Sequence, residues 1–227
     1  MTFFRKIIAI MTFLLFAQGN FAGTMGNTSI DDYTGFYVGA DIGLAGLVNS
    51  ESSDYPYLSH QMSALGIVGG GLVGYDLSLF NRFKLGFEGF LNANGLNIAD
   101  RAYYPPVSAY TVNASYNGGV RVLPGYELSS NIITHAILGY ANAKFNIQDN
   151  GDYGYINQEM NKSGFQAGLG WKIGITPALW VRLDALYTIY NTIASTGGSN
   201  NPSYAFQVYN NQFNTVEGDL TLLYKFN

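Results

Sequence analysis

The chain has 227 residues, no cysteine and a formal net charge of −4. Its length fits one ordinary domain, and the lack of cysteine excludes a disulfide framework and any thiolate metal site or nucleophile. Charged residues make up 11% and aromatic residues 15% of the chain, whereas soluble domains carry about 25% charged residues. This composition favours a protein whose outer surface faces lipid.

The first segment, residues 1–22, is predicted to be a secretory signal peptide of the Sec type. Arg5 and Lys6 give it a positive start, and an apolar run follows over residues 7–17. Such a run is too short for a membrane-spanning helix, and small residues after it suit a cleavage site. We expect cleavage after Ala22.

Cleavage after Gly19 is the alternative. In either case residues 23–34 form a short N-terminal segment of the mature chain. Loss of the two basic residues of the signal peptide leaves a net charge of about −6, which disfavours nucleic acid as a partner because phosphate binding needs a basic face. No later apolar run is long enough for a membrane helix, so a membrane-spanning mature chain must be a closed barrel.

Eight segments with a period of two follow in the mature chain. They are Gly35–Leu47, Ser63–Leu77, Phe83–Asn94, Ser115–Leu128, Ile132–Phe145, Gly164–Ile175, Leu179–Tyr190 and Thr215–Phe226. Their lengths are close to the roughly 9–11 residues that a tilted strand needs to cross a bilayer. The sequence therefore predicts an all-β fold, an eight-stranded antiparallel up-and-down transmembrane β-barrel over residues 35–227.

The gaps between these segments alternate in length. Three short gaps lie at residues 78–82, 129–131 and 176–178, and four long gaps lie at 48–62, 95–114, 146–163 and 191–214. Transmembrane barrels have short periplasmic turns and long outer loops. We therefore expect the long gaps to be exposed loops outside the cell and both termini to be periplasmic.

Side-chain alternation divides the strands into an apolar face and a charged face. Charged residues predicted to point into the lumen are Asp41, Asp76, Lys84, Glu88, Arg121, Glu127, Lys172, Arg182, Asp184, Glu217, Asp219 and Lys225. A soluble barrel such as a lipocalin reverses this order, and the period of two alone does not separate the cases. The signal peptide, the low charge and the gap lengths favour lipid outside. The phase of the second and fifth strands is left open.

Aromatic residues end the apolar faces, as in the girdles of membrane barrels. Those expected near the inner boundary are Phe36, Tyr75, Phe83, Tyr126, Tyr224 and Phe226, and Tyr187 is expected near the outer boundary.

Four motifs stand out in these segments: Gly35-Phe36-Tyr37-Val38-Gly39-Ala40, the glycine-rich Gly69–Tyr75, Leu138-Gly139-Tyr140-Ala141, and the closing Leu222-Leu223-Tyr224-Lys225-Phe226. In this order they resemble motifs of small outer-membrane barrels of the OmpA and opacity-protein type. The resemblance covers residues 35–227 and implies insertion in a Gram-negative outer membrane. It also implies contact with outer-membrane lipid and lipopolysaccharide, and recognition of the last strand by the barrel assembly machinery. We expect the peptidoglycan-binding module of full-length OmpA-type proteins to be missing.

The lumen of an eight-stranded barrel is just wide enough to be filled by side chains. We expect the seven acids and five bases to pair into a network that closes it, because a lone buried ion costs several kcal/mol. The alternative is a small cation-preferring porin, since acids outnumber bases.

The long gaps are rich in tyrosine, asparagine and serine, the residue types of many binding loops. Candidate contact residues are Tyr55, Tyr57, Tyr103, Tyr104, Tyr153, Tyr155, Tyr204 and Phe206. They suggest a surface protein with a structural or adhesive role and a host or cell-surface ligand as a candidate partner. The alternative is a solvated loop surface without a fixed ligand.

No enzyme, cofactor or metal site is predicted. The two histidines are His60, expected in the first loop, and His135, expected near the periplasmic start of the fifth strand. Neither lies in the context of a catalytic site at the outer rim, and no phosphate-binding loop is present.

Overall fold

The computed structural model describes residues 33–53, 59–80, 82–102, 108–151, 154–196, 198–199 and 208–226. Eight long strands are β1 (Gly35–Ser53), β2 (Ser59–Phe80), β3 (Phe83–Ala102), β4 (Ser108–Ser129), β5 (Ile132–Gly151), β6 (Gly154–Gly174), β7 (Leu179–Tyr190) and β10 (Val208–Lys225). Two short strands are β8 (Ile193–Thr196) and β9 (Gly198–Ser199). The predicted signal peptide lies outside the described residues and stays a prediction.

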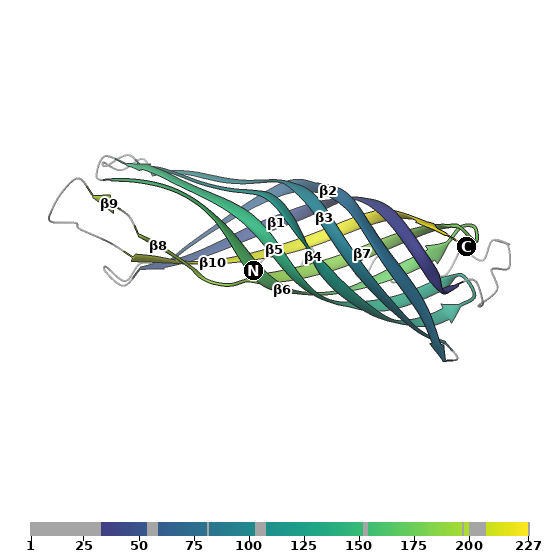
Figure 1. Ribbon diagram of the computed structural model, residues 1–227. Coiled ribbons are helices and arrows are strands. Elements are labelled where there is room, and N and C mark those ends of the chain that lie inside the picture. Colours follow the sequence, from purple (N-terminus) through teal and green to yellow (C-terminus); the bar gives the residue numbers. More distant parts are fainter. Residues whose placement is uncertain are drawn as a thin grey trace.

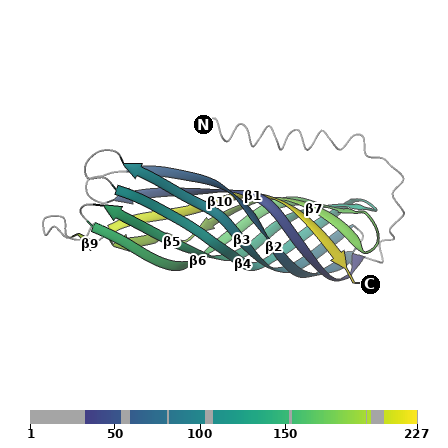
Figure 2. The same cartoon turned by 90° about the horizontal axis from the view of Figure 1, so that it is seen from above.

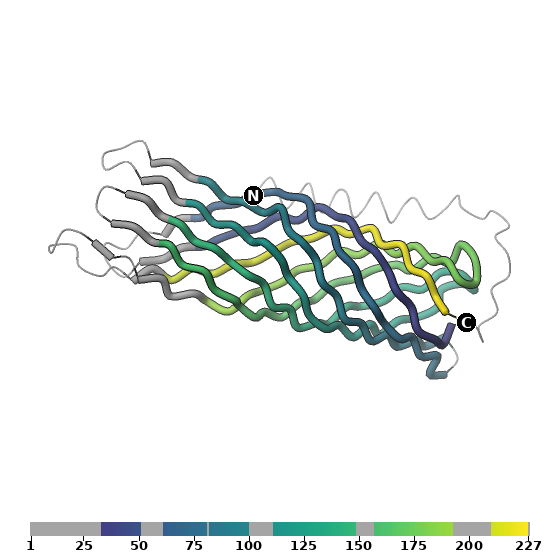
Figure 3. The backbone as a smooth tube through the Cα atoms, turned by 45° about the horizontal axis from the view of Figure 1, so that its top comes forward, coloured from purple at the N-terminus to yellow at the C-terminus, as the bar shows by residue number. Residues whose placement is uncertain are grey.

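Antiparallel pairing closes the eight long strands into a barrel. Each pairs with the next in chain order, and β10 returns to β1 from Tyr37↔Lys225 to Ser53↔Tyr209. Figures 1 and 3 show the strands tilting around a common axis. The structure confirms the predicted all-β, eight-stranded antiparallel barrel. Among the described residues no helix is long and apolar enough to cross a membrane, a finding that leaves spanning by strands untouched.

The three short gaps lie at one end, the short-turn end. Tight turns join β2 to β3, β4 to β5 and β6 to β7, and Figure 2 shows this end opposite β9. In the last turn the amide of Leu179 donates to the hydroxyl of Thr176 at 3.0 Å. Thr34, just before β1, accepts a hydrogen bond from the amide of Ser78 at 3.0 Å, so the chain entering the barrel is held at this end.

Apolar side chains cover the outside of the barrel near the short-turn end. The aromatic residues predicted to face outward at this boundary are partly or largely exposed, and neighbouring rings contact each other, as Phe36 does with Tyr75 and Tyr224 does with Phe226. The structure also settles the two phases left open. Leu72 and Asp76 of β2 point inward, as do His135 and Ile137 of β5.

Most strands are longer than predicted, and this corrects the interpretation of the long gaps as loops. The sheet continues by up to ten residues into those gaps. His60, Tyr110, Tyr155 and Tyr209, expected in loops, have their backbones in β2, β4, β6 and β10. The ladder continues because the inward side chains of these extensions bury one another.

Beyond the middle of the barrel, the sheet separates into two groups of strands. Pairing of β2 with β3 ends at Val68↔Asn94, and pairing of β6 with β7 ends at Gly164↔Tyr190. One group is β3–β4–β5–β6, and the other is β8–β10–β1–β2. The groups diverge at the left of Figure 1. The short strand β9 pairs with Gly154 and Tyr155 of β6, at the outer end of the first group.

The two groups pack face to face around an apolar cluster, the outer core. Its buried members are Ala45, Leu47, Met62, Val68, Leu96, Ile98, Val112, Ala114, Ala143, Phe145, Ile147, Tyr190 and Phe213. Phe145 stacks on Phe213, with ring centroids 4.6 Å apart, and meets Tyr190 edge-on at 5.2 Å. Rings at such separations stabilise a core beyond the effect of the area they bury. The outer core fills the interior of the barrel on the side away from the short turns.

A bulge at Ser115 changes the phase of β4 between the two parts of the barrel. The register of β4 against β5 slips between Ala114 and Tyr116. Asn117 and Arg121 point inward below the slip, whereas Val112 and Ala114 point inward above it. An extra residue in one strand turns the following side chains to the opposite face.

Candidate functional site

The lumen between the short-turn end and the outer core holds the charged residues singled out in the sequence. Eleven of the twelve are buried inside the barrel, and Asp41 is half-buried. They come from seven of the eight long strands. Because the outside of the same strands is apolar, these side chains have only one another, and inward polar groups, as partners.

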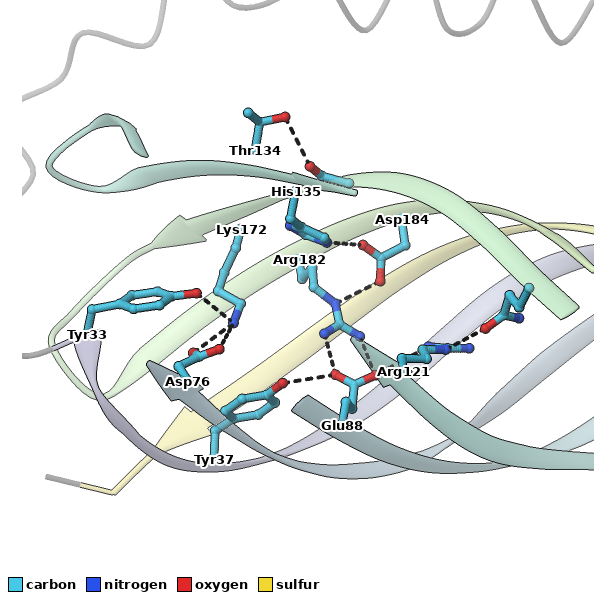
Figure 4. A network of polar contacts seen from close by, with 12 residues as sticks. Tyr33, Tyr37, Asp76, Glu88, Arg121, Thr134, His135, Lys172, Arg182 and Asp184 are labelled. Atoms are coloured by element: carbon cyan, nitrogen blue, oxygen red, sulfur yellow. Dashed lines mark hydrogen bonds and ion pairs between the residues drawn. The ribbon is translucent and has the colours of Figure 1, made fainter. Parts of the chain in front are cut away.

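Glu88 on β3 is the centre of the network in Figure 4. Its carboxylate accepts hydrogen bonds from the guanidinium of Arg182 at 2.5 and 3.3 Å and from Arg121 at 3.4 Å. The hydroxyl of Tyr37 donates to it at 3.2 Å. Three strands thus direct donors at one buried carboxylate from β3. Such charge-assisted bonds are the strong class of hydrogen bond. Removing one partner leaves the other charges buried without compensation.

A second carboxylate extends the network along β7. Arg182 Nε lies 2.7 Å from Asp184, whose other oxygen lies 3.0 Å from Nε2 of His135. On the far side of Glu88, Arg121 donates to the side-chain oxygen of Gln166 at 2.6 Å. Its guanidinium also lies 3.7 Å from the ring centre of Phe90, a cation–π contact.

Three lysines lie towards the short-turn end. Lys172 donates to both oxygens of Asp76 at 2.9 and 3.1 Å, and Lys225 lies 3.6 Å from the same carboxylate. Lys84 forms an ion pair with Glu127 at 3.2 Å. In this part of the lumen three ammonium groups meet two carboxylates, which leaves a net positive charge.

Tyr33 fills the space among these lysines. Its hydroxyl accepts a hydrogen bond from Lys172 at 3.4 Å, and its ring meets Trp180 edge-on at 6.0 Å. Burial, followed by the nearby Asp76 carboxylate, raises the pKa of the Tyr33 hydroxyl well above its usual value. The ring is therefore neutral and compensates the ammonium groups only through its π-face.

Three further acids lie on β1 and β10, towards the outer core. In the described part of the chain none of Asp41, Glu217 and Asp219 forms an ion pair with a base. Thr215 donates to Glu217 at 3.1 Å. The lumen is therefore positive near the short turns, balanced at Glu88, and negative below the outer core. Among the described residues no group of three acids, histidines or cysteines is placed to hold a metal ion.

The candidate loop contacts are not brought together by what the structure describes. Tyr55, Tyr57, Tyr103, Tyr104, Tyr153, Tyr204 and Phe206 lie outside the described residues. Tyr155 is placed only by its backbone, which pairs with Asn150 of β5 and Gly198 of β9. The proposal that these residues contact a ligand therefore remains a sequence-based expectation.

Sequence reasoning missed four partners of the network: Tyr33, Tyr37, His135 and Gln166. Tyr37 and Gln166 share the inward phase of charged neighbours on their own strands, so the alternation could have found them. His135 was missed because the phase of the fifth strand was unreadable. Tyr33 precedes the first strand, and no periodic pattern reaches it.

Comparison with known proteins gives one family and a set of similar folds. A family model described as an outer membrane protein beta-barrel domain matches residues 8–218. No curated protein sequence matches the chain. Among solved structures, the chain is similar to Ail, the attachment invasion locus protein of Yersinia pestis, at 13% identity and a TM-score of 0.40 over 84% of this chain and 98% of that chain.

It is also similar to Neisserial surface protein A, at 17% identity and a TM-score of 0.43 over 84% of this chain and 97% of that one. The outer membrane protease OmpT of Escherichia coli aligns at 9% identity and a TM-score of 0.48, over 85% and 97% of the two chains.

Proposed function

The chain belongs to the outer membrane protein β-barrel domain family, and from that premise we propose that it is a non-enzymatic surface protein whose lumen is closed to solutes. Its role is structural or adhesive. The strand extensions hold the segments that connect them away from the bilayer, and these connecting segments contact other surfaces. It is exported across the inner membrane by the Sec route and reaches the outer membrane through the barrel assembly machinery.

The observation that carries this proposal is the double filling of the lumen. The side chains of Glu88, Arg121 and Arg182 bridge the lumen in the membrane-spanning part, and the outer core fills the lumen above it. An ion crossing the barrel would have to break buried ion pairs and then enter a layer of packed leucine, valine and phenylalanine. Either step costs several kcal/mol.

A cation-preferring pore is the second candidate, and the three unpaired acids favour it. Rings of carboxylates select cations in channels. However, Lys84, Lys172 and Lys225 give the opposite sign at the short-turn end, so a cation would meet repulsion before it reached those acids.

Conductance of the purified protein in planar bilayers separates the two. We expect no steady open steps from barrels whose folding is verified by heat-modifiable migration on a gel. The control is the variant Phe145→Ala/Phe213→Ala, which empties the centre of the outer core and tests whether that layer contributes to closure. Steady steps from the unaltered protein, with a reversal potential that favours potassium over chloride, would establish the pore instead.

The charge of the outer end narrows the class of surface partner. The sequence places six acids beyond the membrane-spanning part, and three bases: Glu51, Asp54, Asp100, Asp149, Asp152 and Glu159 against Arg101, Lys144 and Lys162. One of these bases, Lys144, forms an ion pair with Glu159. The Yersinia protein has a structure in complex with the heparin analogue sucrose octasulfate. Here an acidic outer end disfavours such polyanions, so we infer an uncharged or cationic contact surface.

Adherence of cells that display the protein tests the adhesive role. Segments 54–58 and 103–107 are replaced by glycine–serine sequences of equal length, and adherence is expected to fall while barrel folding is unchanged. Glu159→Gln serves as the control variant that alters charge without touching these segments. Unchanged adherence after both replacements would contradict the adhesive role and leave only the structural role. Binding to immobilised heparin would contradict the inferred class of partner.

A further inference from the structure

Tyr33 is a buried residue at an open end of the barrel. It precedes β1 and belongs to no strand, yet the residue is only 7% exposed. It packs with Tyr37, Leu223 and Trp180 in a cluster inside the short-turn end. A residue outside the barrel wall therefore occupies the space that lumen side chains occupy elsewhere.

Besides this cluster, three lysines from three different strands surround the ring of Tyr33. The ammonium groups of Lys225, Lys84 and Lys172 lie 4.1, 5.2 and 5.4 Å from the centre of its ring. Cations within about 6 Å of an aromatic face are attracted by its quadrupole. The ring both fills the mouth and offsets ammonium charge that Asp76 and Glu127 leave uncompensated.

Side-chain contacts alone hold the ring in place, whereas the backbone next to it is fixed. Thr34 is held by the amide of Ser78, and β1 begins pairing at Gly35↔Asp76. Rotation of one side chain, or of the backbone just before Thr34, would withdraw the ring without opening the ladder.

We propose that Tyr33 is a stopper that closes the periplasmic mouth of the lumen. Its withdrawal exposes a vestibule lined by Lys84, Lys172 and Lys225 that admits small anions and excludes cations. The vestibule is closed above by the Glu88 network, so withdrawal does not create a through path. This inference rests on the proposed closed lumen and specifies what closes its periplasmic side.

Fluorescence quenching of Trp180 tests the stopper. The chain has two tryptophans, so in a Trp171→Phe background Trp180, which contacts Tyr33, is the sole reporter. In folded protein in neutral detergent, Tyr33→Ala is expected to raise quenching by iodide by about threefold or more, because positive sites concentrate anions. Quenching by caesium is expected to stay low. Equal iodide quenching with and without Tyr33 would overturn the stopper, and equal gains for both ions would overturn the anion preference.

Lysine labelling gives an independent measurement with matched variants. Acetylation of Lys84, Lys172 and Lys225 by a water-soluble amine reagent is read by mass spectrometry, with the partly exposed Lys144 as the internal reference. Tyr33→Ala is expected to raise their labelling about tenfold, as local opening does for protected groups. Tyr33→Phe, which keeps the ring, and Tyr126→Ala, which removes a ring on the lipid face, should leave the lysines protected.

Two results keep the stopper distinct from the closed lumen. If Tyr33→Ala lacks heat-modifiable migration and is therefore unfolded, Tyr33→Leu, which retains bulk without a π-face, replaces it and should give an intermediate gain in labelling. Conductance steps from the unaltered protein would defeat the closed lumen. Lysines that are fully labelled in an unaltered, non-conducting barrel would defeat the stopper alone.

Discussion

The two parts of the barrel use the same inward positions for opposite chemistry. In the membrane-spanning part, inward positions carry charges such as Glu88 and Arg182, and the outside is apolar. In the outer part, inward positions carry residues such as Leu47 and Phe145, and outward positions carry Asn113, Asn146 and similar polar groups. Strands that continue into the outer part, such as β4 and β5, therefore invert their polarity where lipid gives way to water. The solvent outside, and not the barrel itself, decides which chemistry faces in.

The largest expected effect comes from breaking the charged network. Glu88→Gln removes the carboxylate that Arg121 and Arg182 share, and loss of one partner from a buried ion pair costs about 3–5 kcal/mol. We expect the free energy of unfolding in detergent, measured by urea titration, to fall by that amount. A loss below about 1 kcal/mol would mean that water already solvates these guanidinium groups.

A cavity in the outer core is expected to have a similar cost but a different reach. Phe145→Ala removes a fully buried ring that stacks on Phe213, at a cost of about 3 kcal/mol or more. Because Phe145 packs within the outer core and not against the Glu88 network, we expect faster protease cleavage in the strand extensions while the membrane-spanning part stays protected. Loss of heat-modifiable migration would show instead that the two parts unfold together.

Outward positions on one strand test the inversion of polarity directly. Val120 is 63% exposed and lies on β4 between Tyr116 and Tyr126. Val120→Lys in lipid vesicles should destabilise the barrel by about 2–4 kcal/mol, the cost of a lysine near the bilayer midplane. Asn113→Lys, outward on the same strand above the bulge, should change stability by less than about 0.5 kcal/mol. Equal costs at both positions would place both parts in the same solvent.

The smallest effect is expected for the ion pair at the barrel surface between the partly exposed Lys144 and the exposed Glu159. Glu159→Gln should change the free energy of unfolding by about 0–1 kcal/mol, and by less at high salt, because water screens surface pairs. A larger loss would indicate that this pair helps to hold β5 and β6 together.

The strand number, the closure and the inward charges of β3, β6, β7 and β10 could be read from the sequence. Their alternation is unbroken: Lys84 and Glu88, or Arg182 and Asp184, recur at every second or fourth position among apolar neighbours. A period of two combined with sharp chemical contrast fixes both the strand and its phase.

The outer extensions could not be read in this way because their polarity is reversed. Phe145, Asn146, Ile147 and Gln148 still alternate, but with the apolar residues on the face that carries charge lower down. A single polarity applied to the whole strand therefore ends it at Phe145. In β4 the bulge at Ser115 adds a slip of phase that alternation alone does not reveal. The partners of Tyr33 depend on three distant strands, so no local pattern encodes them.

The length of the strands has a mechanical consequence for the segments that they carry. Several strands have 20–22 residues, roughly ten more than a bilayer crossing requires, and at about 3.3 Å per residue, with tilt, the excess raises their ends by about 25 Å. The described members of the outer core all lie in the strands themselves. We therefore expect sequence changes beyond the strand ends to leave the stability of the barrel unchanged.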